Sequence, residues 1–226
     1  LINLVEYYNL TNINLLLSEN SLVRNLTDSN SSSNKTKYEK LVKLKNKIKN
    51  IKNCDLKNSA KNIVFGDGNI NAKIMFIGEG PGAQEDAEGI PFVGRAGKLL
   101  DKMLESIKLS RSKIYISNVV NYRPPLNRRP TDAEIKRYLP FLKEHIEIIN
   151  PKILVLLGST ALNTLIGNEV VISKARGKWI QKKIGLANPW IIASFHPAFL
   201  MRQPEQKKFA WIDLKMIREK SKILKI

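Results

Sequence analysis

Cysteine and long apolar runs are both scarce in this chain, and each scarcity limits what the protein can be. The single cysteine, Cys54, cannot form a disulfide within the chain, and such usage is typical of a reducing compartment. No apolar run reaches the roughly 20 residues that a membrane-spanning helix needs. The first residues include Glu6 and lack a basic start, which does not fit a secretory signal. We therefore expect a cytoplasmic protein with no membrane contact.

Acidic side chains are also in short supply relative to basic ones. The chain has 20 Asp and Glu against 38 Lys and Arg, which gives a formal net charge of +18. A surface of that sign attracts polyanions and makes their binding depend strongly on salt. The sequence is rich in Lys, Asn and Ile as well, so part of the charge reflects a compositional bias. We interpret the charge as support for a nucleic-acid partner.

Residues 1–60 differ in composition from the rest, and we expect them to form a variable N-terminal extension. Residues 1–18 could form a short leucine-bearing helix that needs a surface to dock on. Residues 19–36 are rich in Ser and Asn, which predicts a disordered linker. Residues 38–53 place apolar side chains near one helical face between lysines, which predicts a basic helix. Its lysines could simply be solvated, or the extension could contact DNA or a replication or repair partner.

Residues 61–226 alternate short apolar runs with helical patterns, which predicts a parallel sheet covered by helices on both faces. Runs typical of buried strands occupy residues 74–77, 114–120, 153–157 and 190–194. Helices are expected at residues 99–109, from a capping box at 131–134 to about 149, at 160–166 and at 205–224. The expected fold class is α/β, a three-layer α/β/α sandwich around a four-stranded, mainly parallel sheet.

The most distinctive stretch, residues 72–97, joins the first strand to a loop rich in glycine and acid. Gly78, Gly80 and Gly82 let the backbone turn tightly and approach a ligand closely. Three carboxylates follow at the carboxyl end of the strand, where open α/β sheets bind their ligands: Glu79, Glu85 and Asp86. We interpret this loop as a binding site.

The same glycines match the relaxed dinucleotide-binding pattern Gly-x-Gly-x-x-Ala, from Gly78 to Ala83. Three features argue against that alternative. Pro81 lies inside the turn, acidic residues stand where a pyrophosphate would sit, and no helix is expected immediately after the loop. We therefore do not expect a dinucleotide cofactor.

Three loops should meet at one edge of the sheet, because crossovers of one hand bring the carboxyl ends of parallel strands together. They carry Phe92, which offers a flat surface to a planar ring, and Asn118, whose amide can pair with the edge of a base. A neutral His196 can donate a hydrogen bond to an oxygen that becomes anionic. The simpler alternatives are a core phenylalanine, a turn-capping asparagine and a buried histidine. His145, inside a helix of ordinary pattern, is interpreted as structural.

Taken in order, these motifs resemble those of the uracil-DNA glycosylases, specifically the family 4 (thermophilic) type. The similarity spans roughly residues 63–213, and its motifs are residues 78–82 with Glu85 and Asp86, 89–97, 116–120, 123–125 with Asn127 and Arg128, 151–153, 176–177 and 196–202. So many ordered matches are far more specific than any one motif. The resemblance implies hydrolysis of the N-glycosidic bond of deoxyuridine in DNA, with the base flipped out of the stack. It also implies a bacterial-type cytoplasmic protein associated with the nucleoid.

The resemblance implies two catalytic residues and no catalytic metal. Glu85 would organise the attacking water and help to exclude thymine. His196 would stabilise the negative charge that develops on a base oxygen, and preorganised donors of this kind let a uracil anion leave without a metal.

The resemblance also implies which residues bind the substrate. Phe92 would stack on uracil, Asn118 would read its Watson–Crick edge and Gly80 would hold it through the backbone, with Glu79 and Asp86 as further members of the site. The loop 197–202 would press into the duplex, and the residues expected to bind DNA are Arg123, Arg128 and Arg202.

The chain departs from the family at an iron–sulfur site. The resemblance to family 4 implies four cysteines that hold a 4Fe-4S cluster. Alignment with the family places those ligands at Ile51, Cys54, Tyr122 and Tyr138 of this chain. One thiolate cannot hold a cluster that four normally ligate, so we expect no cluster and no other cofactor. Tyr122 and Tyr138 are expected to pack together in its place.

Three alternatives share the same fold. The chain could be a non-catalytic DNA-binding module that lost turnover with its cluster, although Glu85, Phe92, Asn118 and His196 are all retained. Relatives that trap the sugar covalently use a histidine after the second strand, and residues 121–144 contain none. Relatives of broader specificity lack the acid of the first motif, which this chain has.

Overall fold

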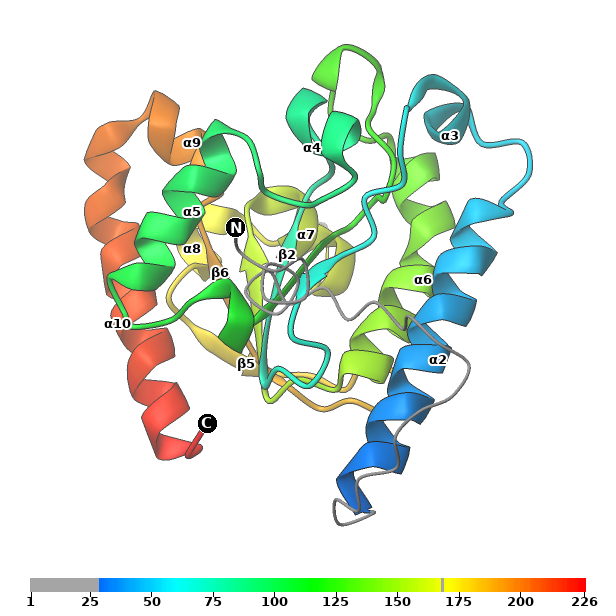
Figure 1. Cartoon of the computed structure of the whole chain (residues 1–226). Coiled ribbons are helices and arrows are strands. Elements are labelled where there is room, and N and C mark those ends of the chain that lie inside the picture. Colours follow the sequence, from blue (N-terminus) through cyan, green and yellow to red (C-terminus); the bar gives the residue numbers. More distant parts are fainter. Residues whose placement is uncertain (1–28, 168) are drawn as a thin grey trace, which may run out of the picture. The chain divides into compact units, whose positions relative to one another are not determined.

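The computed structural model describes residues 29–167 and 169–226 (Figure 1). Within these, Asn34–Ile226 forms one compact unit. The helix expected at residues 1–18, and residues 19–28 of the expected linker, lie outside the described residues. No helix in the described part is long and apolar enough to cross a membrane.

Four parallel strands form the centre of the sheet, as the apolar runs predict. They lie in the order β3 (Tyr115–Asn118), β2 (Ile74–Gly78), β4 (Ile153–Leu157) and β6 (Trp190–Ser194). Every residue of β2, β3 and β4 is buried, because helices cover both faces. The chain order reverses beside β2, so a topological switch point lies between β2 and β4, at the carboxyl ends of these strands.

The sheet has six strands in the structure, so the expectation of four is incomplete. Two short antiparallel strands flank the parallel core: β1 (Asp67–Gly68) pairs with β3, and β5 (Trp179–Gln181) pairs with β6. Neither contains a buried residue. A strand of two or three residues is too short to show the alternation of apolar and polar residues by which strands are predicted from sequence.

Helices cover the two faces of the sheet in separate layers, which confirms the three-layer α/β/α fold (Figure 1). On one face, α5 (Arg95–Glu105) and α10 (Lys207–Ile223) pack Leu100, Leu104, Leu214 and Ile217 against the strands. On the other face lie α2 (Ser29–Lys49), α6 (Asp132–Ile149) and α7 (Ser159–Leu165). Burying these apolar stripes is what holds each helix on the sheet.

Helix α2 belongs to the same core as the sheet. Leu41, Leu44 and Ile48 are each at most 5% exposed and join the cluster that contains β2 and β4. Residues 29–36, expected to be linker, are helical in the structure. The compact unit begins at Asn34, earlier than the boundary near residue 60 that composition indicates.

Helix α6 begins where the capping box predicts. Thr131 Oγ1 accepts the N–H of Glu134 at 3.3 Å, and Glu134 Oε2 accepts the N–H of Thr131 at 2.7 Å. The helix ends at Asn150, which adopts a left-handed conformation. Shorter helices and turns complete the chain: α3 (Asp55–Ser59), α4 (Ala83–Glu88), η1 (Arg111–Lys113), η2 (Pro125–Asn127), α8 (Ile172–Ala175), α9 (Pro197–Arg202) and η3 (Pro204–Gln206).

Candidate active site

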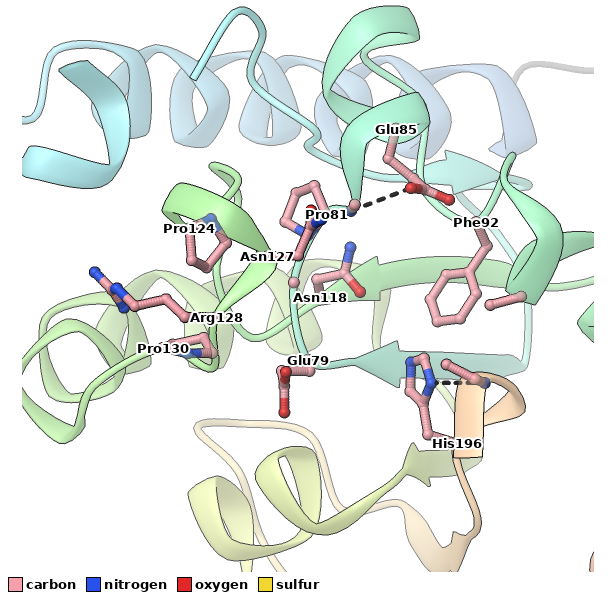
Figure 2. Close-up of a pocket in the computed structure, with 14 residues that line it drawn as sticks. Glu79, Pro81, Glu85, Phe92, Asn118, Pro124, Asn127, Arg128, Pro130 and His196 are labelled. Carbon is pink, nitrogen blue, oxygen red and sulfur yellow. Dashed lines mark hydrogen bonds between the residues drawn. The ribbon is translucent and has the colours of Figure 1, made fainter. Parts of the chain in front are cut away.

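A cavity of about 190 Å³ lies at the carboxyl ends of the parallel strands, where the three expected loops meet (Figure 2). The loops after β2, β3 and β6 all contribute to it. Its lining consists of Glu79, Gly80, Pro81, Gly82, Glu85, Phe92, Ala96, Asn118, Pro124, Asn127, Arg128, Pro130, His196 and Ala198. We call this the site cavity. A second cavity of about 590 Å³ adjoins it, shares Glu79, Asn127 and His196, and extends to Arg202.

Phe92 presents its ring to the site cavity from a strained backbone. Its φ is 56°, in the left-handed region that residues with a Cβ rarely adopt. The ring centroid lies 5.5 Å from that of His196, with the planes tilted by 33°. A Cβ at Gly78 would come within 2.6 Å of the Phe92 ring, so only glycine fits beneath it.

The loop that carries Phe92 is clamped by Arg111, a residue that the motifs do not identify. The guanidinium donates to the carbonyl oxygens of Pro91, at 3.0 Å, and of Phe92. It also bonds Asp101 on α5 at 2.8 Å and Asp67 on β1 at 2.9 Å. The rigid fork of arginine donors is suited to joining several acceptors at once, so Arg111 fixes the strained loop to two other elements.

Asn118, the last residue of β3, offers an unsatisfied amide oxygen. The side chain is 3% exposed, and its Oδ1 has no hydrogen-bond partner within the part of the chain that the structure describes. Buried polar atoms are nearly always paired, so an orphan on a residue that lines the site cavity is suited to a ligand N–H donor. This geometry does not fit the alternative in which Asn118 caps a turn.

Glu85 joins two loops at the edge of the site cavity. Its Oε1 accepts the N–H of Gly94 at 2.8 Å. Its Oε2 accepts the N–H of Gly82 at 3.1 Å, the bond drawn in Figure 2. Glu85 lies on α4, which follows the glycine loop directly, so the expectation of no helix there is wrong. The dinucleotide alternative gains nothing from α4, because the Glu85 carboxylate already holds the Gly82 amide at its start.

Glu79 is fixed by partners from two other elements. Thr160 Oγ1 on α7 donates to Glu79 Oε2, and Arg129 Nε lies 3.5 Å from the same oxygen. Arg129 Nη2 also donates to Thr160 Oγ1 at 2.9 Å. Sequence reasoning missed Thr160 and Arg129, because neither lies in a motif with a recognisable pattern.

His196 caps the start of α9 with a neutral side chain. Its Nδ1 accepts the N–H of Ala198 at 3.2 Å, so this nitrogen carries no proton and Nε2 carries the hydrogen. Burial lowers the pKa of His196 to about 4, and the positive charge of Arg202 acts in the same direction. At neutral pH the ring can therefore donate one hydrogen bond through Nε2.

The strand end that carries His196 is tied to α10 through a buried ion pair. Arg176 Nε donates to Asp213 Oδ2 at 3.0 Å, and Ser194 Oγ donates to the same oxygen at 2.7 Å. The Arg176 guanidinium also lies 5.8 Å from the ring centroid of Phe195, directly before His196. Asp213 is fully buried, so this group of contacts fixes the loop after β6.

The family model of the uracil DNA glycosylase superfamily matches residues 65–215, which contain all of these cavity residues. The chain belongs to the uracil DNA glycosylase superfamily. The match begins at the segment before β1 and ends within α10, so it covers all six strands of the sheet.

Relatives within this superfamily are type-4 uracil-DNA glycosylases. That of Thermotoga maritima is 47% identical over 127 residues, which make up 56% of this chain and 65% of the relative. That of Sulfurisphaera tokodaii is 41% identical over 148 residues, with 63% and 67% covered. That of Archaeoglobus fulgidus is 38% identical over 147 residues, with 63% and 74% covered. The chain thus spans about two thirds to three quarters of these relatives' length.

The positions that align with the iron–sulfur ligands of family 4 glycosylases do not fit a cluster in this chain. Cys54 Sγ lies 3.3 Å from the Tyr138 hydroxyl, and burial followed by this hydrogen bond raises the pKa of Tyr138. Tyr122 and Tyr138 are buried in the same apolar cluster, and Ile51 packs against this cluster. The four positions supply a single thiol, already hydrogen-bonded. Among the described residues, no group of three or more His, Cys, Asp or Glu could hold a metal ion.

Gly80 and Asp86, two of the predicted substrate-binding residues, differ in whether they line the site cavity. Gly80 lines the site cavity, and a Cβ there would come within 2.8 Å of Val120, so a residue larger than glycine would not fit. Asp86 is 2% exposed and does not line the cavity. Its Oδ1 accepts the N–H groups of Lys61 at 2.8 Å and Asn62 at 3.1 Å. In the structure Asp86 anchors the segment before β1 to α4.

Of the three arginines predicted to bind DNA, Arg128 lines the site cavity, Arg202 lines the second cavity, and Arg123 lies beside them through its bond to the lining residue Asn127. Arg123 Nε donates to Asn127 Oδ1 at 2.8 Å, and Arg128 pairs with Glu134 at 2.6 Å. Arg202 is exposed at the end of α9 and borders the second cavity. These positions form a basic edge around the cavity mouths.

Proposed function

We propose that this chain excises uracil from DNA by hydrolysing the N-glycosidic bond of deoxyuridine, which leaves an abasic site. The observation that carries the proposal is the convergence of three groups on the site cavity. These are the aromatic ring of Phe92, the unpaired Oδ1 of Asn118 and the N–H of a neutral His196. A flipped uracil needs each of them: a stacking surface, an acceptor for its ring N–H and a donor for its oxygen.

The reaction breaks the bond between C1′ of the sugar and N1 of uracil. As it breaks, the electron pair moves into the base, and charge develops on an oxygen of uracil. The Nε2–H of His196 donates a hydrogen bond to that oxygen, and a preorganised donor in a closed site stabilises the transition state more than water does. Water then adds its oxygen to C1′, and its proton leaves to solvent or to the uracil anion.

Glu85 has the position to orient that water. Each of its oxygens accepts one backbone N–H, at 2.8 Å and 3.1 Å, and a carboxylate has about four acceptor sites. Capacity remains for a water molecule, whose lone pair then points to C1′. The negative charge also stabilises the positive sugar ring that forms as the base leaves. Glu85 lines the same cavity as Phe92, and we propose that it also helps to exclude the methyl group of thymine.

We propose that the chain does this without an iron–sulfur cluster. None of the groups assigned to chemistry is a cluster ligand, so the reaction needs only the protein's own side chains. The support is the donor set at the aligned positions, where Cys54 is hydrogen-bonded to Tyr138 within a buried cluster.

The DNA substrate is proposed to lie along the basic edge around the cavities, with Arg123, Arg128 and Arg202 near phosphates. A cytoplasmic location at the nucleoid follows from that substrate. A replication or repair partner for the N-terminal extension stays a prediction, because residues 1–28 of that extension lie outside the described residues.

A labelled oligonucleotide with a single deoxyuridine tests the proposal. After incubation and alkali, the proposed function requires strand scission at that position and none in the matched thymidine oligonucleotide. The variant Asn118→Ala should lower the single-turnover rate by about 100-fold, since the uracil edge then loses its acceptor. DNA binding without scission would favour the non-catalytic module instead.

A further inference from the structure

Leu126 is the most exposed large apolar side chain in the described part of the chain, at 96%. It lies at the tip of the loop after β3, inside the turn η2. Its φ is 54° and that of Asn127 is 55°, both in the left-handed region. A leucine that is both strained and fully hydrated is doubly unfavourable, and strain of this kind is typical of functional loops.

The loop holds Leu126 out in a fixed conformation. The N–H of Asn127 bonds the carbonyl of Pro124 at 3.1 Å, and the N–H of Arg128 bonds the carbonyl of Pro125 at 3.1 Å. Side chains brace the same turn, through Arg123 to Asn127 at 2.8 Å and Arg128 to Glu134 at 2.6 Å. The leucine is therefore presented on a rigid support.

The loop that carries Leu126 lies at the site cavity. Pro124, Asn127 and Arg128 all line the site cavity, so the tip stands at its mouth (Figure 2). His196 and α9 approach the cavity from a different direction, from the loop after β6. Arg123, Arg128 and Arg129 flank the tip in the sequence and form a basic collar, in which Arg128 is paired with Glu134 and Arg129 lies 3.5 Å from Glu79. Arginines are suited to phosphate contacts.

We propose that Leu126 is a wedge that enters the base stack of duplex DNA beside the deoxyuridine and holds the helix open while the base is flipped. The inference rests on the proposed function and adds a residue from a different loop to the α9 segment that the resemblance implicates. Apolar side chains inserted between base steps unstack them and kink the duplex. A strained, exposed leucine with a basic collar has the chemistry of such a wedge.

The substitution Leu126→Gly removes the wedge and relieves its backbone strain, because glycine adopts positive φ freely. Its melting temperature should be equal to or above that of the unaltered protein. On duplex DNA with a central deoxyuridine, the single-turnover rate should fall by about 10-fold or more. On the same sequence as a single strand, where little stacking opposes flipping, the rate should change less than about twofold. Leu126→Met should restore most of the duplex rate.

Leu186→Gly is the matched control. Leu186 is 80% exposed in a turn beside Gly185 and lies in neither cavity lining, so this change should leave both rates as they are. A second readout is the fluorescence of 2-aminopurine placed next to the deoxyuridine. Binding of the unaltered protein should raise that fluorescence, and binding of Leu126→Gly should not.

Equal losses on duplex and single strand would overturn the wedge, as would no loss on either. An unaltered protein that cleaves neither substrate would count against the proposed function. The 2-aminopurine signal still decides the wedge in that case: it is supported if the signal depends on Leu126, and overturned if it does not.

Discussion

One buried and one half-buried histidine, His145 and His196, should make folding sensitive to mild acid. Burial lowers the pKa of His145 to about 3, and it lowers that of His196 to about 4. His145 Nε2 lies 3.0 Å from the Tyr115 hydroxyl within the core, as its structural interpretation predicts. Between the unfolded pKa near 6.5 and these values, the unfolded chain binds more protons than the folded protein. Stability contributed by both residues is therefore present above pH 6.5 and lost as the pH falls.

The expected result is a free energy of unfolding that declines below pH about 6.5, by up to ~1.4 kcal/mol per pH unit for each histidine. Urea unfolding at pH 7.5, 5.5 and 4.5 measures this slope. His145→Gln keeps a polar partner for Tyr115 and should reduce the slope by about one histidine's share. A slope that is the same in both proteins would contradict the buried neutral histidine.

Arg111 should act on catalysis through Phe92. The substitution Arg111→Lys keeps a positive charge but loses the fork that joins Pro91, Phe92, Asp101 and Asp67. We expect the single-turnover rate to fall by about 10-fold or more, because small misplacements of a substrate-positioning group are costly. Inhibition by free uracil should weaken in parallel.

A double-mutant cycle separates positioning from general destabilisation. If Arg111 acts by holding Phe92, adding Arg111→Lys to Phe92→Ala should change the rate little further. Arg218→Lys, which alters an exposed pair with Glu219 at 3.2 Å, is the control. Fully additive losses would show that Arg111 does not work through the Phe92 ring.

Helix α2 should be part of the folding unit rather than an appendage. Leu44 is fully buried in the cluster that contains β2 and β4, so Leu44→Ala should lower the free energy of unfolding by about 2–5 kcal/mol. The exposed Val42→Ala, on the same helix, is the control. Denaturant melts give both values. A protein truncated to start at residue 61 should likewise be much less stable than one starting at Asn34, and equal stability would contradict this assignment.

The long elements were predictable from sequence, and the short ones were not. Strands β2, β4 and β6 carry apolar runs that burial on both faces requires, and α6 carries its capping box. Strands β1 and β5 depend on pairing with a neighbour, which no local pattern reveals. The Ser- and Asn-rich start of α2 has the composition of a linker. Local helix propensity does not include the tertiary packing that begins at Leu41, so the sequence alone does not predict a helix there.

The site was predictable where a motif carries the chemistry. Phe92, Asn118, Glu85 and His196 all line one cavity, as strand-end loops of a parallel sheet predict. Asp86 belongs to the same motif, but its side chain accepts hydrogen bonds from backbone amides outside the cavity. Its position next to Glu85 in the sequence does not predict which way its side chain points. Further supporting residues come from distant segments and are found only through tertiary contacts: Arg111, Arg129 and Thr160.

The net charge of +18 should make DNA engagement strongly dependent on salt. On a log–log plot, kcat/KM should fall with salt concentration, by about 0.9 in slope for each phosphate contact. Arg202→Ala should therefore reduce the slope by about 0.9 and weaken binding evenly across sequences. Arg218→Ala, which removes the same charge from α10, should leave the slope closer to that of the unaltered protein. Equal slopes for all three proteins would exclude Arg202 from the DNA contact.

The most direct single test of a cluster-free glycosylase compares uracil release by the whole protein, before and after removal of iron, with uracil release by His196→Ala. The protein should be colourless, contain no stoichiometric iron and cleave deoxyuridine DNA at the same rate before and after treatment with a chelator. His196→Ala should bind the same DNA but release uracil about 100-fold or more slowly, because it lacks the donor to the departing base. Full activity in His196→Ala, or activity that appears only with a bound iron–sulfur cluster, would contradict a cluster-free glycosylase whose chemistry depends on His196.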